Sequence, residues 1–210
     1  MIGFAAPIGV VVAISSIWYW FSPEYTDVGY RPRQPVPFSH KLHAGDMGMD
    51  CRYCHNTVER SPMAAVPPTS TCMNCHWQIK NEDGAQSPRI MPLNESMESG
   101  EPVPWVRVHM LPDYAYFDHA PHVAAGVGCS SCHGRVDGMV TVEQDQPLSM
   151  SWCLDCHRDP EPHLRPLDQV TNMSWFTAEF ADEREEYKYE EDEERTRLPA
   201  PPVHCSGCHR

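Results

Sequence analysis

The stretch FSHKLHAGDMGMDCRYCH, residues 38–55, holds two histidines three residues apart, followed by a Cys-x-x-Cys-His motif. Cys-x-x-Cys-His is the attachment site of c-type haem, in which both sulfurs form thioethers with the porphyrin and the histidine binds the iron. The motif recurs, and its copies are Cys51/Cys54/His55, Cys72/Cys75/His76, Cys129/Cys132/His133, Cys153/Cys156/His157 and Cys205/Cys208/His209. We therefore predict five covalently attached haem c groups, each with one of these histidines as its proximal iron ligand.

Two other kinds of site use paired cysteines at this spacing. Zinc ribbons bind their metal with two Cys-x-x-Cys pairs, and redox dithiols use one. Neither requires histidine directly after the second cysteine, so the five recurrences favour haem attachment. Because all ten cysteines fall in these motifs, none is left over to form a structural disulfide.

The composition leaves little material for an ordinary hydrophobic core. Leu, Ile, Val and Phe make up about 18% of the 210 residues, and the net charge is −13, a combination typical of disordered chains. Five apolar macrocycles would supply the missing interior, and folding would then depend on haem attachment. Few stretches alternate in the way of strands. We predict a mainly α-helical and irregular multihaem cytochrome c with a haem-filled core and little β-sheet.

Residues 2–21 carry no charge, and 20 residues in a helix span the ~30 Å of a bilayer core. Trp18, Tyr19 and Trp20 stand at one end, where an aromatic belt is expected. We predict a transmembrane helix in residues 1–22 and a proline-stiffened spacer in 23–37. A cleavable signal peptide is the alternative, although it would begin with a basic region that is missing here. Since haem attachment takes place outside the cytoplasmic membrane, the haem domain should face the periplasm of a bacterium.

Beyond the spacer the chain repeats itself. Phe38-Ser-His40-x-x-His43 and two motifs are followed, at offsets of 79, 78 and 81 residues, by Phe117-Asp-His119-x-x-His122 and two more. Such duplication predicts two structural modules, residues 38–110 with haems 1 and 2 and residues 111–210 with haems 3 to 5. An insertion at 178–197 has ten acidic and four basic residues. It is either a solvated helix or linker, or a docking surface for a basic redox partner.

A haem iron that only transfers electrons needs a sixth ligand, which histidine or methionine supplies. The pairs His40/His43 and His119/His122 recur at matching offsets, which favours a distal ligand role. Histidines three apart on one helical turn lie close together yet can point at different irons. His163 and His204 lack such a pattern and are interpreted as ordinary residues. A catalytic multihaem reductase would need an open iron position, so this supply of ligands favours electron transfer.

Several strings resemble known families. The F-x-H-x-x-H…C-x-x-C-H arrangement is similar to the small class III multihaem cytochromes, and the duplicated layout resembles the pentahaem donor of periplasmic nitrite reduction. Four longer strings look like the pentahaem cytochrome c subunit of bacterial alternative complex III, namely GYRPRQPVPFSHKLHAGDMGMDCRYCH, VPPTSTCMNCH, GCSSCHGRVDGMV and PLSMSWCLDCHRDPEPHLRP.

The resemblance to alternative complex III implies a membrane-anchored electron-transfer subunit of a quinol:cytochrome c or quinol:oxidase oxidoreductase, with no catalytic site of its own. Its implied partners are an iron–sulfur subunit, polytopic quinol-binding subunits, a monohaem cytochrome c, and a terminal oxidase or soluble cytochrome c; no nucleic acid is involved. Independently, one uncharged helix offers no polar group to deprotonate a quinol. The alternative is a quinol-dehydrogenase cytochrome feeding a periplasmic reductase, which must hold one haem at the membrane surface, whereas 19 positions separate Phe21 from His40 here.

The class III resemblance also implies which haem each distal histidine serves. His40 would bind the iron of the Cys51 haem, His43 that of the Cys72 haem, His119 that of the Cys129 haem and His122 that of the Cys153 haem. For the Cys205 haem the same resemblance points to Met150, with His109 and then Met63 as rivals. Thioether ligation raises the reduction potential, so the haem bound by methionine would be the most oxidising of the five.

Overall fold

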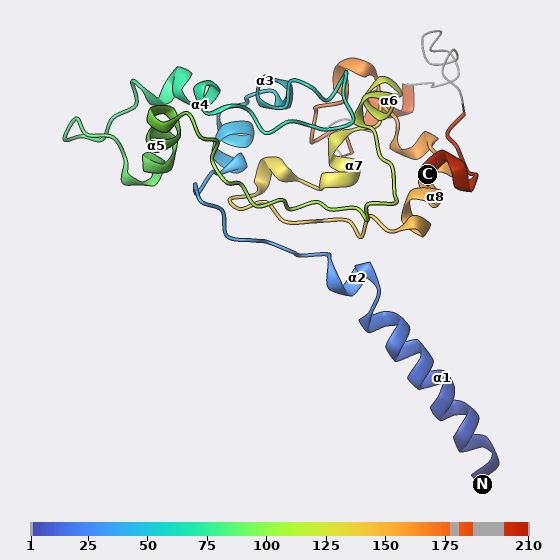
Figure 1. Cartoon of the computed structure of the whole chain (residues 1–210). Helices are drawn as coiled ribbons and strands as arrows, with labels where there is room; N and C mark the ends of the chain where they lie inside the picture. Colours follow the sequence, from blue (N-terminus) through green and yellow to red (C-terminus); the bar gives the residue numbers. More distant parts are fainter. Residues whose placement is uncertain (1, 177–180, 187–199, 210) are drawn as a thin grey trace.

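The computed structural model describes residues 2–176, 181–186 and 200–209 (Figure 1). It shows an elongated body of short helices joined by long irregular segments, from which one longer helix projects. The α-helices are α1 (Ile2–Trp20), α2 (Pro23–Thr26), α3 (Cys51–Cys54), α4 (Thr69–His76), α5 (Met91–Ser99), α6 (His119–Ala124), α7 (Cys129–His133), α8 (Met150–Arg158), α9 (Ala181–Glu186) and α10 (Cys205–Cys208). Single turns of other helix types are η1 (Lys41–Asp46), η2 (Pro88–Ile90), η3 (Val136–Gly138), η4 (Glu161–His163) and η5 (Leu167–Gln169).

Strand pairing is almost absent from the described residues. It is limited to two isolated antiparallel bridges, Ala115 with His209 and Val127 with Leu164. The predicted fold class, mainly helical and irregular with little β-sheet, is confirmed.

Every Cys-x-x-Cys-His motif lies in a short helix or ends one, namely α3, α4, α7, α8 and α10. Polar side chains begin several of the helices around the sites. Oδ1 of Asp50 accepts a hydrogen bond from the backbone N–H of Arg52, at 2.8 Å, at the start of α3. Ser149 caps α8 in the same way. These caps satisfy backbone donors that the first turn leaves free, which explains why such short helices form at these positions.

The apolar core formed by side chains is small. Val36, Met73, Leu93 and Val103 are buried and pack together, with Trp105 against them. The cluster joins the spacer, α4 and α5, so it fixes the second motif against the segment that enters the body. Leu164, Val170 and Trp175 bring the buried apolar residues of the described part of the chain to seven, which agrees with the low aliphatic content of the sequence.

A second buried group surrounds Arg165, whose side chain is inaccessible to solvent. Its Nη1 donates to the carbonyl of Asn172 at 2.7 Å and its Nη2 to Oγ of Ser130 at 3.2 Å, while the guanidinium lies 4.7 Å from the Phe176 ring centroid. Burial lowers the pKa of Arg165 to about 10. A Cβ on Gly128 would lie 1.8 Å from its Cζ, so only glycine fits there. This buried cation ties the third motif to residues 165–176.

Helix α1 extends away from the body (Figure 1), and its described side chains are exposed, with Trp18 at 80%. The chain enters the body where the N–H of Gly29 donates to the carbonyl of Gln144 at 2.7 Å and Arg31 pairs with Glu143. Among residues 2–176, 181–186 and 200–209, no helix is long and apolar enough to cross a membrane. Apart from α9, the acidic segment 178–197 lies outside the described residues.

Leu93→Ala should destabilise the region around the second motif. Leu93 is 4% exposed within the apolar cluster, and truncating such a leucine removes buried contacts and leaves a cavity, at a cost of about 2–5 kcal/mol. Denaturant unfolding of the haem-loaded protein would measure the loss. Met91→Ala, in the same helix but 53% exposed, should change stability by roughly 0.5 kcal/mol or less. Equal effects of the two substitutions would contradict the assignment of Leu93 to the core.

Candidate haem sites

Each of the four paired histidines lies opposite one motif histidine. The ring centroids of His40 and His55 are 6.4 Å apart with ring planes 4° from parallel, and those of His43 and His76 are 6.2 Å apart at 44°. The second repeat has the same arrangement. His119 and His133 are 6.3 Å apart at 5°, and His122 and His157 are 6.0 Å apart at 38°.

This separation is the one that a metal ion between two imidazoles requires. A histidine nitrogen binds a metal at about 2 Å, as zinc sites show, and a ring centroid lies roughly 1 Å farther back. Two rings on opposite sides of one ion therefore have centroids about 6 Å apart, whereas directly stacked rings would be closer. With two nearby cysteines per site, the residues fit a haem c, which the two cysteines would attach and the two histidines would bind at the iron.

Hydrogen bonds to the other ring nitrogen orient these histidines. Nδ1 of the motif residue His55 donates to the carbonyl of Ala65 at 2.8 Å, and that of His157 donates to the carbonyl of Pro202 at 2.7 Å. Nδ1 of His119 donates to the carbonyl of Pro62 at 2.7 Å. An Nδ1–H bound to a carbonyl leaves Nε2 as the metal-binding atom and fixes the plane of the ring.

The second histidine of each pair is held by its own helical turn. Nδ1 of His43 donates to the carbonyl of Ser39 at 2.8 Å, and Nδ1 of His122 donates to the carbonyl of Asp118 at 2.6 Å. Both acceptors lie four residues earlier in the chain. The two repeats therefore share this hydrogen bond as well as their residue pattern.

A phenylalanine separates the rings of each pair. Phe38 lies edge-on to His40, at 4.8 Å between centroids and 86°, and is stacked on His43 at 4.4 Å and 25°. Phe117 repeats this geometry with its own pair, at 4.7 Å and 85° for the first histidine and at 4.7 Å and 33° for the second. The phenylalanine thus contacts both rings of a pair, and their planes lie at different angles to its own, as would suit two separate irons.

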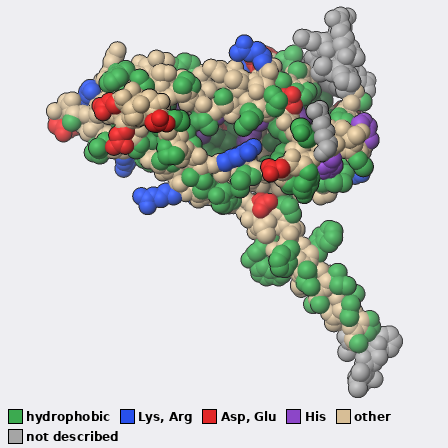
Figure 2. Space-filling view, viewed as in Figure 1, with side chains coloured by type: hydrophobic (Ala, Val, Ile, Leu, Met, Phe, Trp, Pro, Cys, Tyr) green, Lys and Arg blue, Asp and Glu red, His purple; other side chains and the backbone are tan. Residues whose placement is uncertain are grey.

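Burial favours the neutral form of two of these imidazoles, and metal binding requires that form. The pKa of His40 is lowered to about 4, first by burial and then by the neighbouring His55 and His43. The pKa of His133 is lowered to about 3, again first by burial and then by His109 and the other nearby histidines. Figure 2 shows histidine side chains inside a hollow on the face of the body.

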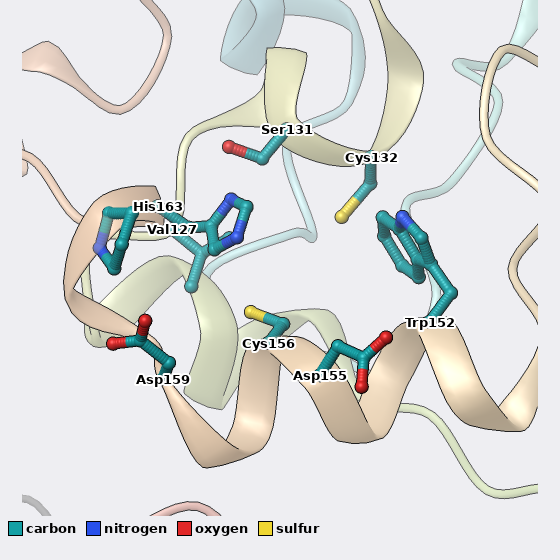
Figure 3. A pocket seen from close by; sticks show the side chains of 9 residues that line it. Val127, Ser131, Cys132, Trp152, Asp155, Cys156, Asp159 and His163 are labelled. Atoms are coloured by element: carbon teal, nitrogen blue, oxygen red, sulfur yellow. The ribbon is translucent and has the colours of Figure 1, made fainter.

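The cysteines lie beside the histidine pairs, and none is in a disulfide. Cys132 and Cys156, from different motifs, line one pocket together with Trp152, Val127 and His163 (Figure 3). In this view the two sulfurs point into the same space between α7 and α8. Two attachment sites thus open onto a shared cavity, whose lining also includes Ser131, Asp155 and Asp159.

The fifth motif has different surroundings. Nδ1 of His209 donates to the carbonyl of Tyr114 at 3.1 Å, and the Tyr114 ring lies 5.8 Å from the His209 ring. Of the three residues considered as its iron ligand, Met150 begins α8 and is 65% exposed, and Met63 is 63% exposed. The third, His109, lies at a different motif.

His109 contacts the proximal histidine of the third motif. Its Nε2 is 3.3 Å from Nδ1 of His133, and the two rings meet edge-on at 4.4 Å and 86°. If Nε2 of His133 were to bind iron, its Nδ1–H would donate to Nε2 of His109. The structure therefore brings His109 next to the Cys129 site. His109 contacts Nδ1 of His133, just as backbone carbonyls contact Nδ1 of His55 and of His157.

Sequence reasoning missed three kinds of functional group. The orienting carbonyls of Ala65, Pro62 and Pro202 carry no side-chain signal. The contact of His109 joins positions 24 residues apart that no spacing rule connects. The phenylalanine contacts could have been found, because Phe38 and Phe117 stand at the same place in both repeats.

Two comparisons with known proteins agree with this geometry. Residues 36–90 match the family described as cytochrome c7 and related cytochrome c. A relative from Nitratidesulfovibrio vulgaris (strain Hildenborough), described as the multiheme cytochrome c subunit of menaquinone reductase, is 36% identical over 194 residues, covering 82% of this chain and 87% of the relative. The chain belongs to the multihaem cytochrome c family, whose members carry covalently bound haem c.

His43→Ala should convert one haem to the high-spin state, because His43 faces His76 at the separation that one iron would bridge. The optical spectrum of the mature ferric protein would show the change, and the haem to protein ratio should stay constant because the cysteines are intact. His204→Ala is the matched control, since His204 is exposed and is not among the proposed iron ligands. If His43→Ala keeps every haem low-spin, His43 is not a ligand.

Proposed function

We propose that this chain is the electron-transferring cytochrome subunit of a quinone-linked oxidoreductase complex in the bacterial cytoplasmic membrane, and that it carries five haem c groups. The observation that carries the proposal is the fourfold recurrence of histidine rings about 6 Å apart beside Cys-x-x-Cys pairs. At such sites both facing histidines would bind the iron, which would suit electron transfer and leave no place for a substrate at the iron.

In this proposal each residue has a defined role. The ten motif cysteines hold the haems, and the five motif histidines supply the proximal nitrogens. His40, His43, His119 and His122 supply the distal nitrogens, each toward the motif histidine that it faces. The haem supplies reversible one-electron oxidation and reduction. The backbone carbonyls and phenylalanines described above keep the imidazole planes fixed, so that little rearrangement accompanies a change of oxidation state.

The membrane attachment is proposed from α1. This helix carries no charge, its described side chains are exposed, and it extends away from the body. Exposed apolar side chains of this number require a lipid or protein environment. We propose that α1 attaches the chain to the membrane and to membrane subunits, with the haem-bearing body on the periplasmic side.

We further propose that the complex is of the alternative complex III type, in which electrons leave a quinol and pass to a cytochrome c or an oxidase. The support is the similarity of four strings, including residues 29–55 and 147–166, to its pentahaem subunit. Its other subunits would then be an iron–sulfur protein, polytopic quinol-binding proteins and a monohaem cytochrome c. The quinol site would belong to those partners, because α1 contains no Asp, Glu, His, Lys or Arg.

A second candidate is the opposite direction of electron flow. The 36%-identical relative is described as a subunit of menaquinone reductase, which delivers electrons to a quinone. The same row of haems could serve either direction, since the potentials of donor and acceptor determine it. The intact complex distinguishes the two, through quinol oxidation with cytochrome c as acceptor or menaquinone reduction with reduced cytochrome c as donor.

Protein lacking residues 1–21 should be soluble, contain five haems by pyridine haemochrome assay, and show no quinol oxidation of its own. The proposed haem ligands all lie beyond residue 37, and α1 contributes attachment only. The full-length chain in its complex is the control and should turn over quinone or quinol. Four or fewer haems in fully matured protein would refute the assignment of all five motifs, and turnover by the truncated chain alone would refute the electron-transfer role.

For the Cys205 haem we propose Met150 as the sixth ligand, because the structure places His109 against His133. Met150→Ala should remove the sulfur-to-iron charge-transfer band in the far red of the ferric spectrum and leave one haem high-spin. His109→Ala should leave that band in place. The reverse outcome, with five low-spin haems in Met150→Ala and a high-spin haem in His109→Ala, would make His109 the ligand.

A further inference from the structure

The five attachment sites are arranged in space in an order that differs from their order in the sequence. Three junctions between neighbouring sites follow the sequence order, and one does not. The inference rests on the proposed function, since it concerns the path of electrons along the haems.

The first and second sites are neighbours. His40 and His43, on adjacent positions of one helical turn, face His55 and His76 of these two motifs. Cys54 of the first motif also lies close enough to Cys72 of the second for their charges to interact. A single turn therefore holds one side of both sites.

The first site, and not the second, adjoins the third. The imidazoles of His40 and His55, in the first site, lie close enough to His133 to lower its pKa. The thiols of Cys51 and Cys129 lie close enough together that each shifts the pKa of the other. Imidazoles and thiols of the two motifs thus approach each other, although the motifs stand 78 residues apart in the sequence.

Backbone contacts between the two repeats fix the same junction. The carbonyl of Pro62, in the loop after the first motif, holds Nδ1 of His119 at 2.7 Å. Turn η1 packs directly against η3, where the N–H of Lys41 donates to the carbonyl of Met139 at 2.9 Å. A Cβ on Gly45 would lie 2.3 Å from the carbonyl oxygen of Asp137, so this glycine permits the close approach.

The remaining junctions follow the sequence. Cys132 of the third motif and Cys156 of the fourth line one pocket (Figure 3). The carbonyl of Pro202, three residues before the fifth motif, holds Nδ1 of His157 at 2.7 Å. The fourth and fifth motifs also approach each other through Cys153 and Cys208.

The second and fifth sites differ from the other three in the exposure of their cysteines. Cys75 of the second motif and Cys205 of the fifth are exposed, while the other eight cysteines are half-buried. In Figure 1, α4 lies toward one end of the body, and α8 and the C-terminus lie toward the other.

We propose that the haem sites form a single row in the order Cys72, Cys51, Cys129, Cys153, Cys205. Electrons then pass between the two repeats from the Cys51 site to the Cys129 site, and the Cys72 site is an end of the row instead of an intermediate. Because tunnelling falls steeply with distance, exchange with partner proteins is expected at the two exposed ends.

Iron positions in the mature full-length protein test this order. Anomalous diffraction at the iron absorption edge, or a cryo-EM map of the complex, would locate each iron and assign it to its cysteines. We expect the iron of the Cys51 site to have the irons of the Cys72 and Cys129 sites as its two nearest neighbours. An iron of the Cys72 site lying between those of Cys51 and Cys129 would overturn the proposed order.

The same iron positions distinguish a failure of the proposed order from a failure of the proposed function. Fewer than five irons, or irons without histidines on both sides at the four paired sites, would refute the proposed haem ligation. Five correctly ligated irons in sequence order would refute only the row proposed here. Five irons, with the iron of the Cys51 site between those of the Cys72 and Cys129 sites, would support both.

Discussion

Two imidazole rings held about 6 Å apart, on opposite sides of a space for one metal ion, are the constraint on which this structure depends. The ring of a motif histidine is positioned by its short helix and the ring facing it by a turn elsewhere in the chain. An iron bound by both rings of a pair would join two segments that the small apolar core does not hold together. Four such irons would connect most of the body and would account for a defined fold in a chain with so few aliphatic residues.

The two repeats of the sequence correspond to two similar arrangements of these histidine pairs. Phe38 and Phe117 separate two rings in the same way in both repeats, so each repeat places two sites side by side. The repeats meet where Pro62 holds His119 and where His133 approaches His40 and His55. This contact places two haem sites from different repeats close to each other and makes one continuous assembly of two similar units.

Much of the architecture could be predicted from the sequence because the decisive signals are local. The helices around each Cys-x-x-Cys-His motif, the scarcity of strands and the repeated histidine pairs all follow from spacing, and the structure shows them. The four pairs of facing histidines are those that the class III resemblance implied as ligands of one haem each. Iron ligation itself stays a prediction. The position of His109 against His133 and the approach of Cys51 to Cys129 could not be predicted, since they arise from packing between repeats. Residues 178–180 and 187–197 of the acidic segment lie outside the described part of the chain.

Electron paramagnetic resonance of the fully oxidised, mature protein tests the ligation of the irons most directly. Four low-spin irons per chain with two histidine ligands each are expected, and two of them, at His40/His55 and His119/His133, should give the rhombic signals of nearly parallel ligand planes. High-spin signals from two or more of the five irons would contradict the account, because at least one faced pair of histidines would then not enclose an iron.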